Sequence, residues 1–237
     1  MGGLIKICGR YTTLTEDEII EVRSIIQEIS MRLIKDDMDS YIPPSGEIRP
    51  TDKAPIITAN NDVVAFESAK FGFKNWNGKG VIINARSETV AEKNMFKKHL
   101  QTGRCVVPAG EYYEWKERIE ADTTDKTPKK KSKKPKKVKH FITDKEGNML
   151  FFAGLYRDYE GEREFVIITK DATAEVAEIH DRMPVILRVN QIEAWLSGEL
   201  SAEDIIHLDF TSTVVAMCNE KDAIDEREEG DTQLSLF

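Results

Sequence analysis

The amino-acid sequence predicts an α+β fold: one domain with an antiparallel, barrel-like β core flanked by helices. Short runs of β-branched and aromatic residues recur along the chain and are separated by turn signals, as in an antiparallel sheet. Helical spacing of apolar residues is confined to a few segments. The 237 residues, 40% of them hydrophobic, are sufficient for a core of their own.

The first predicted helix begins at a capping box, Thr15 to Glu18. Its apolar residues follow at spacings of three and four, namely Ile19, Val22, Ile26, Ile29 and Leu33. The proline- and glycine-containing stretch 41–55 is expected to be a surface loop. A second helix is predicted from Ser87 as its cap to near Gly103.

The remaining elements are mostly strands. Strands are predicted at 55–59, 63–66, 81–83, 104–108, 112–116, 140–143, 150–156, 165–169 and 211–217. Short helices are predicted at 174–179, 191–196 and 202–206. A lysine-rich stretch at about 117–139 interrupts the strands and is expected to be a long loop, with eight lysines in 129–139.

The composition excludes several classes of protein. No apolar run approaches the roughly 20 residues that cross a bilayer, and the residues before Cys8 are too few for a secretory signal. The three cysteines, Cys8, Cys105 and Cys218, fit no zinc or disulfide pattern, which favours a reducing cytoplasm. The net charge of −8 does not exclude nucleic-acid binding, because basic groups can be concentrated in one place.

Four short runs hold the candidate chemistry. Cys8 and Arg10 of CGRY point to one face if the run is a strand, and Asn84 and Arg86 share a face in INARSET. Glu114 lies in the aromatic run GEYYEWK, an environment that tends to raise the pKa of a carboxyl group. His180 lies in IHDRMP, at the end of a helix. Each residue alone has an ordinary structural explanation: a buried thiol, a turn amide, a paired carboxylate or a helix terminus.

Taken together and in this order, the runs CGRY, INARSET, PAGEYYEWK and IHDRMP resemble those of the SOS response-associated peptidase family. The resemblance spans Cys8 to about Met217. It implies a protein that captures abasic sites in single-stranded DNA through an N-terminal cysteine.

The resemblance also implies roles for individual residues. Cys8 is expected to be the nucleophile, Asn84 to position its amino group, and Glu114 and His180 to transfer protons. The expected DNA contacts are Arg10, Arg86, Pro50, Trp76, Thr169 and Arg182. The loop around Pro50 matches the family pattern only loosely.

An N-terminal cysteine suits this chemistry because it presents an α-amine, with a pKa of ~7.7–8, beside a thiol. The amine can form an imine with the aldehyde of an abasic site, and the thiol can close a thiazolidine ring. In this chain MGGLIKI precedes Cys8, unlike the usual family pattern. These residues 1–7 are interpreted as a propeptide removed by attack of Cys8 on the Ile7 carbonyl. A misassigned start or an inactivating extension are the alternatives.

The residues after the predicted catalytic domain, 8–218, form an acidic tail, 219–237, that cannot fold alone. It ends in QLSLF, which resembles a bacterial sliding-clamp-binding peptide with Gln233, Leu234, Leu236 and Phe237 as the contacts. No metal or cofactor is expected, and the chain is expected to be a monomer that binds single-stranded DNA. A general cysteine peptidase and a non-catalytic DNA and clamp adaptor are the competing functions.

Overall fold

The computed structural model describes residues 9–29, 33–38, 41, 46–60, 63–117, 137–208 and 213–217. The helices are α1 (Glu16–Ile29), α2 (Asn94–Thr102), α3 (Ala174–Ala177), α4 (Val189–Ser197) and α5 (Ala202–His207). The first strands are β1 (Arg10–Thr12), β2 (Leu33–Asp36), β3 (Glu47–Ile48), β4 (Lys53–Asn60), β5 (Val63–Phe71), β6 (Phe73–Lys74), β7 (Val81–Ile82) and β8 (Asn84–Arg86). The others are β9 (Arg104–Ala109), β10 (Tyr112–Glu117), β11 (Lys137–Asp144), β12 (Leu150–Tyr159), β13 (Glu162–Asp171), β14 (Arg182–Pro184), β15 (Ile186–Leu187) and β16 (Thr213–Met217).

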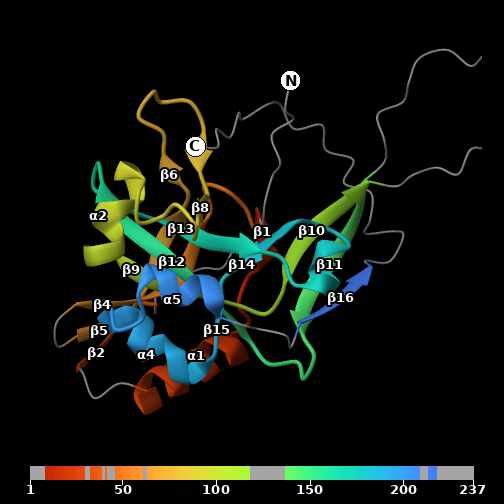
Figure 1. The fold of residues 1–237 in the computed structure, drawn as a ribbon. Helices are drawn as coiled ribbons and strands as arrows, with labels where there is room; N and C mark the ends of the chain where they lie inside the picture. Colours follow the sequence, from red (N-terminus) through yellow and green to blue (C-terminus); the bar gives the residue numbers. More distant parts are fainter. Residues whose placement is uncertain are drawn as a thin grey trace, which may run out of the picture.

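The larger sheet contains a ring of strands. β13, β12, β9, β4 and β5 pair in that order, and β13 pairs again with β5 to close the ring. β8 then continues along β13 where β5 leaves it, so that it lies at the rim of the ring. A separate five-stranded sheet has the order β16-β11-β10-β1-β3. Figure 1 shows its strands β10, β11 and β16 to one side of the ring.

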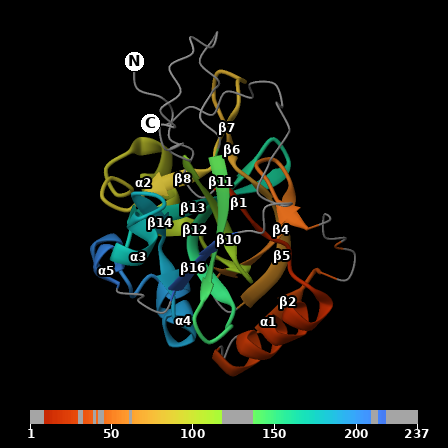
Figure 2. The ribbon, with the colours of Figure 1, turned by 90° about the vertical axis from the view of Figure 1, so that its right-hand side faces the viewer.

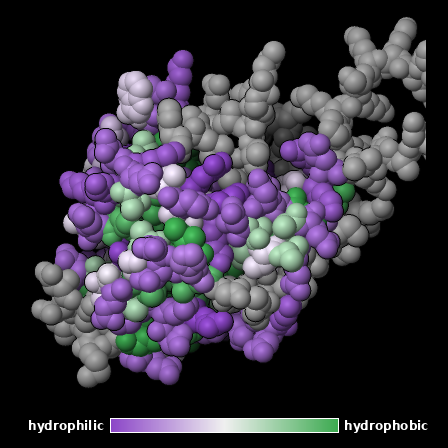
Figure 3. Space-filling model, in the orientation of Figure 1, coloured by the Kyte–Doolittle hydropathy of each residue, from purple (hydrophilic) through white to green (hydrophobic). Residues whose placement is uncertain are grey.

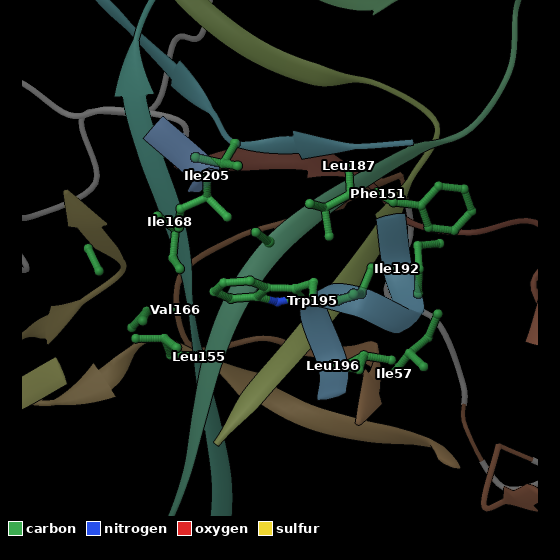
Figure 4. Packing of buried hydrophobic residues seen from close by; sticks show 14 of the residues in the cluster. Ile57, Phe151, Leu155, Val166, Ile168, Leu187, Ile192, Trp195, Leu196 and Ile205 are labelled. Carbon is green, nitrogen blue, oxygen red and sulfur yellow. The ribbon is translucent and has the colours of Figure 1, made fainter. Parts of the chain in front are cut away.

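Buried side chains form two clusters, one on each face of the ring strands. The inner core joins the ring to the five-stranded sheet: Tyr11 packs edge-on against Phe71 and Phe152, and Tyr112 against Phe152. The outer core lies beneath the helices and is centred on Trp195, whose indole lies among ring residues in Figure 4. The buried Nε1–H of Trp195 donates to the Cys105 carbonyl at 2.9 Å, which satisfies its one polar group.

Local sequence signals explain the helix ends. At α1, Thr15 Oγ1 accepts from the Glu18 N–H at 3.2 Å while Glu18 accepts from the Thr15 N–H at 2.7 Å, which confirms the predicted capping box. Val22 and Ile26 of α1 are buried in the outer core. α4 ends at Gly198, whose φ of 90° is readily adopted only by glycine. Figures 1 and 2 place α1 and α4 together at the base of the molecule.

The structure confirms the α+β class and the barrel-like core, with differences in detail. Most strand pairs are antiparallel, but β2 and β5, β5 and β13, and β8 and β13 run parallel. The helix predicted from Ser87 was wrong in its first part, because 87–93 form turns and α2 begins only at Asn94. The Ser87 N–H instead donates to the Thr169 carbonyl and extends the pairing of β8.

The predicted loops were also too long. β10 continues to Glu117 and β11 begins at Lys137, where the two residues pair, so the lysine-rich connection is shorter than 117–139. The predicted loop 41–55 contains β3 and the start of β4. In the described part of the chain, no helix is long and apolar enough to cross a membrane. The face in Figure 3 is predominantly hydrophilic, with small hydrophobic patches.

Candidate active site

The rim of the ring presents Asn84 and Arg86 on one face of β8. Side chains alternate along a strand, so Ala85 between them faces the outer core while Asn84 and Arg86 face the other way. Asn84 pairs in register with Ile167 of the inner core. Asn84 is buried and Arg86 exposed. The predicted common face of these two residues is therefore confirmed, and it turns toward the five-stranded sheet.

Glu114 approaches from that sheet. It shares a face of β10 with Tyr112, which is buried in the inner core, so both side chains point between the sheets. The Glu114 side chain is deeply buried, at 2% exposure. A carboxyl group withdrawn from water in this way needs partners within the protein or a proton.

The start of β1 lies between the two elements just described, β8 with Asn84 and the sheet that contains Glu114. A Cβ built on Gly9 would lie 3.4 Å from Cδ1 of Ile83, the residue immediately before Asn84. The polypeptide therefore enters β1 against the beginning of β8. Cys8, the predicted nucleophile, lies outside the described residues.

His180 follows α3 and has its side chain 10% exposed. Its Nδ1 accepts from the Arg182 backbone N–H at 3.1 Å and lies 3.0 Å from an Asp181 carboxylate oxygen. Burial lowers the pKa of His180, and the charges of Lys137 and Arg182 add to this against the opposing effect of Asp181. The neutral ring that accepts at Nδ1 carries its proton on Nε2, so His180 can donate a hydrogen bond from Nε2.

Lys137 acts electrostatically on His180 from a different part of the molecule. Lys137 begins β11 of the five-stranded sheet, whereas His180 precedes β14 of the larger sheet. The electrostatic effect of Lys137 on His180 places these two segments near each other.

His140 is a residue that the sequence analysis missed. It pairs directly with Glu114 across β10 and β11, so the two side chains share the inward face. It is buried, and its Nδ1 lies 3.0 Å from the Val138 carbonyl. Burial lowers the pKa of His140, with Lys116 contributing, so the neutral form with Nδ1–H and a free Nε2 lone pair is favoured. Nothing in the sequence signalled His140, because its position opposite Glu114 depends on how β10 and β11 align.

Arg10 lies on the opposite face of the five-stranded sheet from Glu114. It pairs with Tyr113, and its guanidinium lies 5.0 Å from the ring centroid of Trp115. It also forms an ion pair with Glu47 at 3.5 Å. Arg10 therefore remains partly accessible but is engaged within the protein.

Thr169 and Arg182, two predicted DNA contacts, are buried beside β8. The Arg182 guanidinium donates to both carboxylate oxygens of Glu88, to Asp171 and to the Thr169 carbonyl. In this arrangement Arg182 braces the strand end that positions Arg86. Direct contact of either residue with DNA stays a prediction.

Trp76 and Pro50 lie in connecting segments. Trp76 follows β6 and is 80% exposed, the most exposed large hydrophobic residue described. Pro50 begins a tight turn in which the Asp52 N–H donates to the Arg49 carbonyl at 3.0 Å. The next residue, Thr51, has φ of 80°, an unfavourable conformation for a β-branched residue and one that often marks a functional segment.

Other predicted contacts fall outside the described part of the chain. These are Gln233, Leu234, Leu236 and Phe237. Among the described residues, no group of three or more His, Cys, Asp or Glu side chains is arranged to hold a metal ion.

Comparison with known proteins identifies relatives over most of the chain, including the segments that contain these motifs. A model of the SOS response associated peptidase family matches residues 7–218. The abasic site processing protein YobE of Bacillus subtilis is 32% identical over 225 residues, covering 84% of this chain and 86% of its own. The abasic site processing protein YoqW of Bacillus phage SPbeta is 33% identical over 224 residues, covering 84% of each. YedK of Escherichia coli, another abasic site processing protein, is 26% identical over 221 residues, covering 89% of this chain and 88% of its own.

Solved structures share the fold. A protein from Bacteroides thetaiotaomicron aligns with a TM-score of 0.63 at 20% identity, covering 90% of this chain and 93% of its own. A phage-related protein from Bordetella bronchiseptica aligns with a TM-score of 0.63 at 23% identity, covering 90% of this chain and 95% of its own. At these identities the likeness supports the fold alone.

Proposed function

Because the chain belongs to the SOS response associated peptidase family, we propose that it captures abasic sites in single-stranded DNA covalently through Cys8. The names of its relatives as abasic site processing proteins support the substrate. The main observation in support of the proposal is that the start of β1, the start of β8 and Glu114 of β10 come together at the rim of the ring. Gly9 lies against Ile83, beside Asn84, while Glu114 points between the sheets from the facing wall.

The proposed capture joins two groups of Cys8 to one carbon of the abasic sugar. The α-amine adds to the aldehyde carbon of the open sugar to give a carbinolamine, which loses water to form an imine. The thiol sulfur then adds to the imine carbon, and its proton passes to the nitrogen as the thiazolidine closes. Glu114 protonates the departing hydroxyl and accepts the proton released from the amine.

His180 is proposed to assist opening of the closed sugar. Its pKa is lowered by burial, which favours the neutral ring, and the Nε2–H donates a hydrogen bond to the ring oxygen of the sugar. As the ring opens, that oxygen takes a proton from water and the C1 hydroxyl gives its proton to water. Asn84 is proposed to orient the α-amine, and Arg86 to contact a phosphate. These roles need the amine and thiol of Cys8 close to Asn84 and Glu114, and Gly9, the next residue in the chain, lies against Ile83.

We further propose that Cys8 is exposed by self-cleavage. The thiolate attacks the Ile7 carbonyl, the peptide nitrogen leaves with a proton from Glu114, and water then hydrolyses the thioester. The products are the free α-amine of Cys8 and a peptide of residues 1–7 that ends in a carboxylate. Replacing Cys8 with Ala should leave the full-length chain uncleaved.

A protein expressed with Cys8 directly after the initiator methionine separates capture from self-cleavage. In that protein, Glu114→Gln should slow adduct formation with abasic single-stranded DNA by ~10²–10⁴-fold, as expected for loss of a general acid–base group. Its affinity for undamaged single-stranded DNA should stay unchanged. An undiminished adduct rate in Glu114→Gln, or a stable adduct in Cys8→Ala, contradicts the mechanism.

The C-terminal QLSLF is proposed to bind a bacterial sliding clamp, which would bring the protein to replicating DNA. Deleting residues 233–237 should abolish capture of the chain on an immobilised clamp. DNA crosslinking by the shortened protein should be unchanged. Clamp binding that survives the deletion excludes the motif as the contact.

A further inference from the structure

The hairpin that carries Trp76 leaves the ring of strands at β13 and returns to it. The end of β5 pairs with β13 at Phe165, and the start of β8 pairs with β13 at Ile167. Between these two points β6 and β7 form a separate two-stranded sheet, with Trp76 in their connection. Figures 1 and 2 show this connection projecting beyond the ring of strands. We call residues 73–82 the Trp76 hairpin.

Two side chains of the larger sheet hold the base of the Trp76 hairpin. An isolated two-stranded hairpin is only marginally stable in water, and its outer edges need hydrogen-bonding partners. The Arg157 guanidinium of β12 donates to the Lys74 carbonyl at 2.7 Å, and the Glu164 carboxylate of β13 accepts from the Lys74 N–H at 3.1 Å. Both backbone polar groups of Lys74 are thus bonded from one side, as a third strand would bond them.

Arg157 and Glu164 act on the hairpin as one unit. They are direct cross-strand partners on β12 and β13, and the guanidinium donates at 2.8 Å to the carboxylate oxygen that also accepts from Lys74. The two side chains are 15% and 5% exposed, so water competes little for these bonds. The guanidinium also lies 4.5 Å from the centroid of the buried Phe73 phenyl group. The pair therefore holds the hairpin through its backbone and through a side chain.

The base of the hairpin determines where Trp76 lies. Trp76 is only two residues beyond Lys74, and its own side chain is largely exposed, so it has little packing of its own to fix it. At its other end the hairpin continues through Ile83 into β8, which carries Asn84 and Arg86. A change of angle at Lys74 therefore moves Trp76 relative to these two residues of the candidate site.

We propose that the Arg157–Glu164 pair is a positioning device for DNA binding, which holds the Trp76 hairpin at the angle at which the indole stacks on a base. That the ligand is single-stranded DNA rests on the proposed function. The pair acts through Trp76 and not by touching the strand. A base gains most from an aromatic group that is already in place, because ordering the hairpin before binding reduces the entropy lost in the complex.

The test is a double-mutant cycle between the pair and Trp76, measured by fluorescence anisotropy of an undamaged, labelled single-stranded oligonucleotide. Arg157→Met/Glu164→Met removes both charges together, so the net charge is unchanged and no buried charge is left unpaired. It should weaken binding by about 5-fold or more, the lower end of the range expected for loss of one stacked base. In a protein that carries Trp76→Ala, the same replacement should have no further effect.

Lys70→Met/Glu162→Met is the matched control. This ion pair joins β5 to β13 at 3.1 Å, and its removal also leaves the net charge unchanged. The control should bind DNA as the unmodified protein does. The proposal is overturned if Arg157→Met/Glu164→Met binds no more weakly than the control. It is also overturned if the replacement costs as much affinity in the Trp76→Ala protein, because the pair then acts independently of Trp76.

Hydrogen exchange tests the positioning step without DNA. The amides of residues 73–82 should exchange faster in Arg157→Met/Glu164→Met than in the control, while the strands of the ring stay protected. Unchanged exchange in the hairpin overturns the proposal. If the double replacement unfolds, Arg157→Lys takes its place in the cycle, because lysine keeps the charge but lacks the planar fork that reaches both Glu164 and Lys74. An unchanged affinity of folded Arg157→Lys then overturns the proposal.

The cycle and covalent capture can fail separately. The undamaged oligonucleotide has no aldehyde, so its affinity reports non-covalent binding alone. A protein that forms no adduct with abasic DNA contradicts the proposed function, whereas a loss of affinity that depends on Trp76 still supports the positioning role. Normal capture together with a loss that does not depend on Trp76 overturns the positioning role alone.

Discussion

Glu114 and His140 are direct cross-strand partners on β10 and β11, and both side chains are buried on the face between the sheets. His140 uses Nδ1 toward the Val138 carbonyl, so the neutral ring carries its lone pair on Nε2. If the carboxyl group of Glu114 transfers protons, its protonated form therefore has a possible hydrogen-bond acceptor in its cross-strand neighbour. We therefore propose that His140 is a positioning residue for Glu114.

Replacing His140 with Phe should slow adduct formation, because Glu114 loses the neighbour that stabilises its protonated form. We expect a rate between those of the unmodified protein and Glu114→Gln. The pH at which the rate is half-maximal should also move, which a purely structural role would not cause. Single-turnover rates from pH 5 to 9 measure both, and a profile identical to that of the unmodified protein contradicts the role.

Acidification should destabilise the fold before carboxylates begin to protonate. The pKa values of His99, His140 and His180 are all lowered, in each case chiefly by burial. In the unfolded chain these rings titrate near pH 6.5, so below that pH the unfolded state binds more protons than the folded state. Stability is therefore lost as the pH falls through about 6.5.

The melting temperature at pH 7.5 and pH 5.5 measures this effect. The drop between the two should be smaller in His99→Gln than in the unmodified chain, because one histidine with a lowered pKa has been removed. An equal or larger drop in the variant contradicts the assignment of the effect to buried neutral histidines.

Arg182 should contribute to stability more than an exposed ion pair does. Its guanidinium is buried and bonds to both oxygens of Glu88 and to the Thr169 carbonyl. Glu88 and Asp171 are more exposed, so the expected cost of Arg182→Met is only about 1–2 kcal/mol, below that of a fully buried pair. Urea unfolding gives the value.

The control for Arg182 is Lys145→Met, which removes an exposed partner of Glu175. An exposed pair of this kind is worth about 0–1 kcal/mol. Equal free energies of unfolding for Arg182→Met and Lys145→Met contradict the bracing role of Arg182.

Trp76 should matter for DNA and little for stability. Its side chain is 80% exposed, so Trp76→Ala removes little buried surface. Stacking of a base on an aromatic ring is worth roughly 1–3 kcal/mol, so the affinity for single-stranded DNA should fall about 5- to 150-fold. Ile20→Ala, another exposed apolar residue, should leave this affinity unchanged. Equal affinities for the two variants exclude stacking on Trp76.

Features set by neighbouring residues were predictable from the sequence. The Thr15–Glu18 capping box and the shared face of Asn84 and Arg86 each depend on contacts within a few positions, and the structure confirms both. Alternation along β10 also places Glu114 with Tyr112, once β10 is known to cover the inner core.

Features set by strand register were not predictable. The pairing of Glu114 with His140 requires knowing how β10 and β11 align across a long connection. The turns at 87–93 replace the expected helix because Ser87 bonds to Thr169, a residue on β13. The ion pairs of Glu47 with Arg10 and Lys139 likewise join β3 to β1 and β11, which the sequence does not place together.

The central claim is covalent capture by the amine and thiol of Cys8. Intact mass spectrometry before and after incubation with abasic single-stranded DNA tests it most directly. The account predicts a protein that begins at Cys8 and gains the mass of the oligonucleotide less one water. A full-length protein that still carries residues 1–7 and gains no mass contradicts it.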